Sequence, residues 1–392
     1  MNKSNSVVLF CCLVLFVSQF LFLSWGDADS NVRRAILVVN LLCLLWQTGK
    51  VLIGVHYLPF LAKWIPVFLV YQSIYAFANI EMLTAYLPTI FLVFLFFYVG
   101  LGIGVLGKGH KIGVVAIALL LIYVPQYFLF NESRIVREDL LHRYSNNFGY
   151  LFLLLVPMFL FFKNRIIQLV FVLISSGFCV MCFKRGAILI LAGILGIYLW
   201  SVLKSDVKYK WLFVVGALLP VGIVSGIYLV ENAEMIFYRF QTVSDGSGRA
   251  DMYNLILTGA IDSPFSFLIG HGFFTTYELF YEKLGVALMA HSDYFQILYD
   301  CGIIGCFMYG LLMIGGVKIL TDVRKKAPEY YWITLILLFV WFSKALISGV
   351  MVDKSCATIF LSLGYVSGIT YRHRYHVIHN KGFTNRKASC HG

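Results

Sequence analysis

Charged residues are scarce in this chain. Asp, Glu, Lys and Arg make up 13% of its 392 residues, whereas a soluble globular domain carries about 25%. Hydrophobic residues account for 60% of the sequence and aromatic residues for 17%. A chain of this length needs far less apolar material to build a water-soluble core. The composition therefore excludes an ordinary soluble protein and predicts an all-α polytopic membrane protein.

The signatures of several other protein classes are missing as well. The sequence holds no P-loop and no nucleophile elbow, and its nine cysteines show no metal-ligand spacing. His271 and His291 lack cysteine partners and make a weak metal site. The 12 excess positive charges lie in short clusters between apolar runs, which argues against nucleic acid as a partner. We therefore expect no metal, no other cofactor and no bound nucleic acid.

Long apolar runs are abundant. About twelve stretches approach the roughly 20 residues that a transmembrane helix needs. The first, Val7–Leu23, lacks the small-x-small cleavage site of a signal peptide and is expected to remain as a helix. The second to the twelfth cover residues 35–53, 58–79, 84–106, 112–130, 147–162, 166–183, 186–203, 211–230, 293–317, 330–350 and 355–371.

The placement of lysine and arginine predicts the orientation in the membrane. With the N-terminus inside, the cytoplasmic connections hold the clusters Lys108/Lys111, Lys163/Arg165, Lys204/Lys208/Lys210 and Lys318/Arg324/Lys325/Lys326. The chain then divides into nine helices over residues 1–230 with a small outward loop at about 131–147, a large outward loop over 231–292, three helices over 293–371, and a loosely ordered, basic cytoplasmic tail over 372–392.

The large outward loop begins with a candidate phosphate-binding turn. Residues 244–248 are rich in glycine, and Arg249–Ile261 follows with helical spacing that places Met252, Leu255, Ile256 and Ala260 on one face. Such a turn presents backbone N–H groups and the positive end of a helix dipole. Arg249 stands at the helix start, where a guanidinium can bind phosphate oxygens in a bidentate way. An ordinary surface helix with a capping arginine explains the same pattern.

The rest of the loop predicts a second helix. Residues 262–264 end the first helix, residues 269–273 form a tight glycine turn, and Thr275 with Glu278 matches a capping box. An aromatic and apolar stripe follows, formed by Tyr277, Phe280, Tyr281 and Leu284. The stripe is typical of a helix on the membrane surface, and its aromatic faces also suit a groove for sugars.

Four further positions carry chemistry-bearing groups. His291 precedes the tenth predicted helix, and its pKa near neutrality suits a general base that takes a proton from a sugar hydroxyl. Asp293 or Asp300 is a candidate to orient it, and His271 is a rival base. An interfacial histidine without a role is the alternative for His291.

Cations also occur where the positive-inside trend disfavours them. Lys184-Arg185-Gly186 lies at the outward end of a helical hairpin, as either a snorkelling pair or a pyrophosphate clamp. Lys344 is the one charge well inside a predicted span, which predicts a functional role, although it lies close enough to the outer end to snorkel.

These residues resemble a known group, the O-antigen polymerase and O-antigen ligase superfamily of bacterial inner membranes. Three marks carry the resemblance, which covers about residues 145–310. They are His291-Ser292 followed by Gly302-Ile-Ile-Gly305, similar to the family's H-[N/S]…G-x-x-G pattern; Ser247-Gly248-Arg249 in the large loop; and Lys184-Arg185-Gly186 before an apolar helix. Ser292 stands where ligases commonly have asparagine, which favours the polymerase.

The resemblance implies a metal-independent, inverting glycosyltransferase in the inner (cytoplasmic) membrane, with its active face in the periplasm. Its donor is a glycan on undecaprenyl diphosphate. The acceptor is a second lipid-linked repeat unit for a polymerase and the lipid A–core oligosaccharide for a ligase. The implied partners are these substrates, membrane lipid and a chain-length regulator.

The resemblance also implies roles for particular residues. His291 corresponds to the base that activates the acceptor, and Arg249 and Arg185 to the groups that hold the diphosphate and stabilise the charge of the leaving group. Expected substrate contacts are Lys184, Gly248, Tyr281, Asp293 and Lys344.

Three functions compete at this point: the polymerase, the ligase of the same fold, and a flippase or secondary transporter for a polysaccharide lipid. A transporter is expected to carry paired broken helices and ionisable residues near the midplane of the membrane. This sequence shows one such charge, Lys344, and concentrates its polar groups in outward loops. The pattern favours chemistry at the membrane surface.

Overall fold

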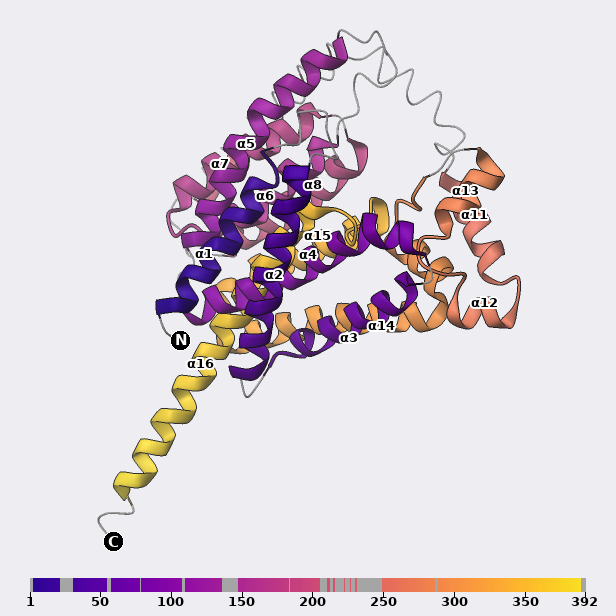
Figure 1. The fold of residues 1–392 in the computed structure, drawn as a ribbon. Helices are drawn as coiled ribbons and strands as arrows, with labels where there is room; N and C mark the ends of the chain where they lie inside the picture. The colour runs from indigo at the N-terminus through magenta and orange to yellow at the C-terminus, as the bar shows by residue number, and fades with distance from the viewer. Residues whose placement is uncertain are drawn as a thin grey trace.

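The computed structural model describes nine segments of the chain: residues 3–21, 31–54, 58–77, 79–107, 110–135, 147–182, 184–204, 249–285 and 288–388, with a few separate positions between 205 and 248. Throughout these residues the secondary structure is helical (Figure 1). The predicted span 211–230 and the turn 244–248 therefore lie almost wholly outside the described residues.

Each of the other predicted spans coincides with a helix. The helices are α1 (Lys3–Ser18), α2 (Asn31–Gly54), α3 (Phe60–Ala76), α4 (Ile80–Val105), α5 (His110–Ile135), α6 (Phe148–Phe159), α7 (Arg165–Met181), α8 (Arg185–Leu203), α14 (Asp293–Lys326), α15 (Tyr331–Ile347) and α16 (Ala357–Ala388). Within the described part, six helices are long and apolar enough to cross a membrane, in α2, α4, α5, α8, α14 and α15, and four shorter apolar helices lie in α1, α3, α6 and α7. The all-helical membrane architecture is thus confirmed.

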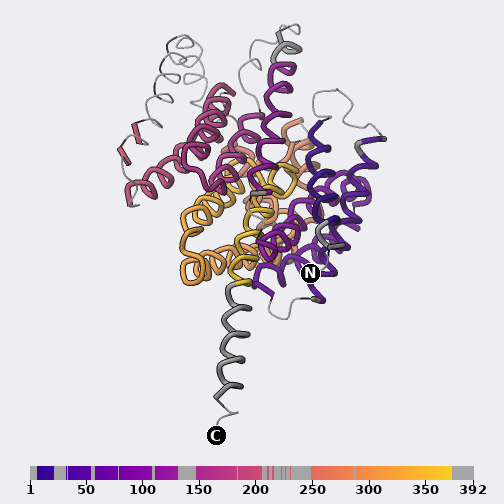
Figure 2. The backbone as a smooth tube through the Cα atoms, turned by 90° about the vertical axis from the view of Figure 1, so that its left-hand side faces the viewer, coloured from indigo at the N-terminus to yellow at the C-terminus, as the bar shows by residue number. Residues whose placement is uncertain are grey.

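The last helix is longer than the predicted span. Helix α16 continues to Ala388 instead of ending near residue 371. Figure 2 shows the first part of α16, in yellow, among the other helices of the bundle.

Helices α4 and α16 make the closest helix pair, and glycine is the reason. Gly100 and Gly104 on α4 face Gly364 and Gly368 on α16, each pair four residues apart. A Cβ at any of the four would overlap the backbone of the opposite helix. Small residues at this spacing let two membrane helices approach until their backbones touch. The pair forms the centre of the buried apolar core.

Helix α14 is interrupted at Gly302, which adopts φ 63° and ψ −163°. The interruption frees three carbonyl oxygens from the helix ladder, and each gains a new donor. The N–H groups of His271 and Gly272 donate to Tyr299 O and Asp300 O at 2.9 and 2.8 Å, and Tyr71 Oη of α3 donates to Cys301 O at 3.2 Å. The break therefore fastens the turn at residues 269–273 to the membrane helix.

Replacing Gly302 with alanine is expected to destabilise the protein. This backbone conformation is essentially restricted to glycine, and straining it costs about 1–3 kcal/mol. A Cβ here would also lie 2.6 Å from Gly270 N and from the Leu268 carbonyl group. The thermal unfolding midpoint of the detergent-solubilised protein should fall. Gly310→Ala, in the same helix with nothing within 4 Å of the added Cβ, is the control, and equal midpoints for the two variants would contradict the account.

Three short helices lie at the N-terminal end of α14: α11 (Arg249–Ala260), α12 (Pro264–Ile269) and α13 (Thr276–Leu284) (Figure 1). The predicted helix over 249–261 is confirmed, and Met252, Ile256 and Ala260 are buried as its spacing indicates. Met252 and Ile256 form a small second core with Phe280, Ala290 and Tyr299. The loop therefore folds onto the start of α14 and does not depend on a disulfide.

The predicted capping box of α13 is wrong, although the helix begins where expected. Thr275 makes no side-chain cap, and its hydroxyl donates instead to Gly272 O at 2.9 Å. The N–H groups of Phe274 and Thr276 donate to the buried carboxylate of Asp300 at 3.0 and 3.1 Å. A carboxylate accepts stronger hydrogen bonds than a hydroxyl, so Asp300 of α14 replaces the local cap.

Candidate functional site

A cavity of about 510 Å³ lies at one end of the helix bundle. It brings together three residues that the sequence singled out, Lys184, Arg249 and His291, although they are far apart along the chain. The full lining is Gln19, Phe20, Phe130, Asn147, Phe148, Tyr150, Leu151, Lys184, Arg249, His291, Ser348, Val352, Asp353, Lys354 and Ser355. All these residues come from segments that the positive-inside rule places on the outward side.

Lys184 is held by the tight packing of its turn against α6. It is the N-cap residue of α8, with φ −82° and ψ 100°. A Cβ on Gly149 would lie 3.1 Å from Lys184 Cβ, and one on Gly186 would overlap the Tyr150 hydroxyl. The two glycines therefore let the turn approach α6, which fixes the direction in which Lys184 enters the cavity.

Arg249 is the first residue of α11 and is partly buried. Its Nη1 donates to the carbonyl oxygen of Ile347, the last residue of α15, at 3.2 Å. A cation beside the C-terminus of a helix is stabilised by the helix dipole. This contact anchors one edge of the guanidinium, and the group carries five N–H donors in total. The anchor therefore leaves donors to serve a ligand in the cavity.

His291 is the third cavity residue that the sequence singled out. It lies before Ser292, the N-cap of α14, with a left-handed φ of 53°. Histidine tolerates this conformation better than most residues, and strained backbone tends to occur at functional sites. His291 is exposed at the cavity, but partial desolvation of its ring, and then the positive charges of Arg249 and Lys184, hold its pKa below the usual 6.5. The imidazole is therefore neutral at physiological pH and can accept a proton.

The remaining wall is the connection between α15 and α16. Lys344 is fully buried, and its ammonium group donates to Gly349 O at 2.7 Å and pairs with Asp353 at 2.8 Å. Asp353 also accepts from Ser355 N at 3.0 Å, which starts the short 3₁₀ helix Lys354–Cys356. Lys344 thus supports the cavity wall from behind and does not line the cavity itself.

Neither candidate carboxylate contacts His291. Asp293 is buried and accepts from the N–H groups of Val350 and Met351 and from Tyr309 Oη at 2.8 Å. Asp300 caps α13. Asp293 therefore joins the backbone between the lining residues Ser348 and Val352 to the start of α14, which follows His291. Asp293 itself does not line the cavity.

The other predicted site residues lie elsewhere. Arg185, the neighbour of Lys184, is exposed and does not line the cavity. Tyr281 is 65% exposed on α13, also outside the lining. Gly248 falls outside the described residues. The ring of His271 contacts Gly259 O at 2.9 Å and stacks on Tyr299, so it fastens the glycine turn to α11.

Asp353 and Lys354 are the charged lining residues that sequence reasoning missed. Their signal was present: they are the two charges in the short connection after the span that contains Lys344. A buried lysine near the end of a helix needs a partner, and the nearest acidic residue along the chain is Asp353. In the described part, no three His, Cys, Asp or Glu side chains are grouped to hold a metal ion.

The fold and cavity define a multi-pass membrane protein with a basic pocket at one end of its helices, suited to a phosphate-bearing substrate. Residues 169–310 match the family model Wzy_C, described as O-Antigen ligase. The match confirms the resemblance seen in the sequence and contains Lys184, Arg249 and His291. It indicates a glycosyltransferase-type enzyme that acts on lipid-linked polysaccharide. No match was found among curated proteins.

Proposed function

We propose that the protein is an O-antigen polymerase that transfers a glycan from undecaprenyl diphosphate to a second lipid-linked repeat unit on the periplasmic side of the inner membrane. The observation that carries this proposal is that one cavity, at the predicted outward end of the helices, holds Lys184, Arg249 and His291 together. Such a place suits a substrate whose lipid lies in the membrane and whose sugars project into water.

The basic side chains suit the diphosphate. Lys184, Arg249 and Lys354 line the cavity, while the negative charge of Asp353 is paired with Lys344. Guanidinium and ammonium groups form charge-assisted hydrogen bonds to phosphate oxygens, and they stabilise the charge that develops as the diphosphate leaves. In this arrangement Lys184 takes the position beside Arg249 that the family resemblance gives to Arg185.

His291 supplies the proton acceptor. The acceptor hydroxyl oxygen attacks the anomeric carbon of the donor sugar, and the bond from that carbon to the diphosphate oxygen breaks on the opposite face. The electron pair stays on the diphosphate, next to Arg249 and Lys184. The hydroxyl proton passes to the neutral ring of His291. One displacement inverts the configuration at the anomeric carbon.

Asp353 is the carboxylate in the lining, and it is a poorer base. Burial raises the pKa of its carboxyl, but the ion pair with Lys344 and the hydrogen bonds from Ser355 outweigh burial and leave the pKa below its ordinary value. A carboxylate with a low pKa accepts a proton weakly at neutral pH. His291 therefore suits the reaction better.

The second candidate is the ligase, because the matched family is described as O-Antigen ligase. Ser292, in place of the asparagine common in ligases, favours the polymerase. The full-length protein, reconstituted with undecaprenyl-diphosphate-linked repeat units from the source strain, separates the two. Growth of the glycan on the lipid carrier without lipid A–core supports the polymerase. Transfer that occurs only when lipid A–core is added supports the ligase, and no transfer in either mixture contradicts both.

The rate of transfer is expected to depend on pH through His291. Because the pKa of His291 is lowered, the acid limb of kcat/KM should lie below pH 6.5, with activity lost as the ring becomes protonated. In Lys184→Gln one of the positive charges that lower this pKa is removed, so the limb should move to higher pH. A pH–rate profile of both proteins measures this shift. An acid limb at the same pH in both would contradict the electrostatic link.

A further inference from the structure

A second cavity, of about 360 Å³, lies at the opposite ends of α6, α8 and α15. Its lining comes from the α6–α7 turn, the last turns of α8 and the connection between α14 and α15: Leu160, Phe161, Phe162, Lys163, Arg165, Gln168, Tyr198, Ser201, Lys204, Pro328, Glu329, Tyr330, Trp332, Ile333 and Ile336. The glycosyl-transfer reaction uses none of them. The positive-inside rule places this end on the cytoplasmic side.

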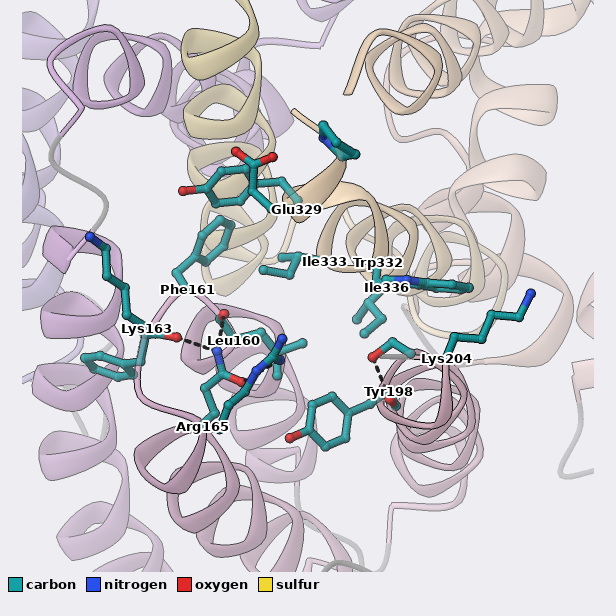
Figure 3. A pocket seen from close by; sticks show the side chains of 15 residues that line it. Leu160, Phe161, Lys163, Arg165, Tyr198, Lys204, Glu329, Trp332, Ile333 and Ile336 are labelled. Atoms are coloured by element: carbon teal, nitrogen blue, oxygen red, sulfur yellow. Dashed lines mark hydrogen bonds between the residues drawn. The ribbon is translucent and has the colours of Figure 1, made fainter. Parts of the chain in front are cut away.

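The charges of this cavity favour an anion. Lys163, Arg165 and Lys204 outnumber the single acidic residue, Glu329. Figure 3 shows Arg165 reaching into the space between the helices, with Lys163 and Lys204 flanking it on either side and Glu329 across the cavity from Arg165. Arg165 is also the first residue of α7, where the positive end of the helix dipole disfavours a cation. An anion bound beside Arg165 would be attracted by the guanidinium and by the positive end of the α7 dipole.

Arg165 and the cavity floor are held in place. Arg165 Nη1 donates to Gln168 Oε1 at 3.2 Å. The amide nitrogen of Gln168 donates in turn to Leu160 O at 3.0 Å and to Phe162 O, the carbonyl groups at the end of α6. Gln168 is buried. The guanidinium is therefore pre-positioned by a buried amide and retains N–H donors that face the cavity.

Tyr198 supplies an independent observation. Its side chain is 3% exposed, and within the described residues its hydroxyl has no hydrogen-bond partner. A buried hydroxyl without a partner is unfavourable, so a ligand that accepts a hydrogen bond from it would be favoured. Figure 3 shows the ring of Tyr198 extending from α8 toward the side of the cavity that carries Arg165.

We propose that this cavity binds a phosphate group, with Arg165 and Tyr198 donating to its oxygens and Lys163 and Lys204 adding positive charge. The aromatic rings of Trp332 and Tyr330 in the lining suit the level of lipid headgroups, where such residues are enriched. Basic pockets between membrane helices on this side bind the headgroups of anionic lipids. The phosphate therefore belongs either to an anionic phospholipid or to a soluble phosphate compound. This site stands apart from the proposed transferase function.

The test uses the full-length protein in a non-ionic detergent. Native mass spectrometry and the thermal unfolding midpoint report binding of phosphatidylglycerol, of phosphatidylcholine as the net-neutral reference, and of inorganic phosphate. Wild-type protein is expected to bind phosphatidylglycerol more tightly than phosphatidylcholine. Stabilisation by inorganic phosphate as well would identify a soluble source, and stabilisation by the lipid alone would identify the membrane.

The variants are chosen to separate the site from general surface charge. Arg165→Gln should weaken binding by about tenfold or more, and Tyr198→Phe by about two- to tenfold, from the lost hydrogen bonds. Lys325→Gln removes an exposed cation at the same end of the bundle, outside the lining, and should leave binding unchanged. Equal losses in Arg165→Gln and Lys325→Gln, or no loss in Arg165→Gln and Tyr198→Phe, would overturn the proposal. Tyr198→Phe removes one atom only, so the test survives a folding defect in Arg165→Gln.

Discussion

Replacing Arg249 with alanine is expected to lower kcat/KM for glycan transfer by about 100- to 1,000-fold, the usual cost of removing one preorganised donor that stabilises developing negative charge. Arg249 lines the cavity and is anchored to Ile347 O at 3.2 Å. Arg249→Lys retains the charge but loses the planar fork that binds two phosphate oxygens, so it should recover only a small part of the activity. Initial rates with the reconstituted protein measure both effects.

Lys283→Ala is the matched control for Arg249. Lys283 is an exposed cation in the same loop region, on α13, and does not line the cavity. Its replacement should leave the rate within about twofold of wild type, since rim and surface charges contribute little. If Arg249→Ala and Arg249→Lys both transferred glycan at the wild-type rate, at equal protein levels, the diphosphate-binding role would be wrong.

Replacing His291 with glutamine is expected to lower kcat by about 100- to 10,000-fold, the range for loss of a general base. Glutamine keeps a polar side chain but accepts no proton near neutral pH. The residual activity should also lose the acid limb of its pH profile, which a merely structural role would not produce. The left-handed φ of 53° adds strain in the variant, so protein levels must be matched.

The second loop histidine provides the comparison. His271 contacts Gly259 O at 2.9 Å and stacks on Tyr299, away from the cavity lining. His271→Gln should therefore lower the unfolding midpoint while it preserves the pH profile. The assignment would fail if His271→Gln abolished the acid limb and His291→Gln kept it.

The positions of the membrane helices could be predicted from sequence because they depend on local apolar runs. The sequence predicted that Lys184, Arg249 and His291 lie in outward connections, and their position in one cavity agrees with that prediction. The sequence could not show which of two adjacent cations faces the cavity. Lys184 is the N-cap of α8 and Arg185 its first helical residue, and this small difference in helix phase directs only Lys184 inward.

Long-range contacts explain the other differences. The capping box at Thr275 failed because Asp300, on another helix, takes the N–H groups of Phe274 and Thr276. The break at Gly302 exists because the turn at residues 269–273 supplies donors to the freed carbonyl groups. Asp293 was expected beside the substrate but joins the 350–351 backbone to α14. None of these pairings is encoded in the local pattern of residues.

The most direct test of the polymerase assignment is a lipopolysaccharide gel of the source strain with the gene deleted, complemented with wild type or with His291→Gln. We expect deletion to replace the O-antigen ladder with a single-repeat band on lipid A–core. Wild type should restore the ladder, and the variant, present at equal level in the membrane, should not. Loss of all O-antigen from lipid A–core, with long glycan left on the lipid carrier, would identify a ligase instead. An unchanged ladder in the deletion strain would contradict both assignments.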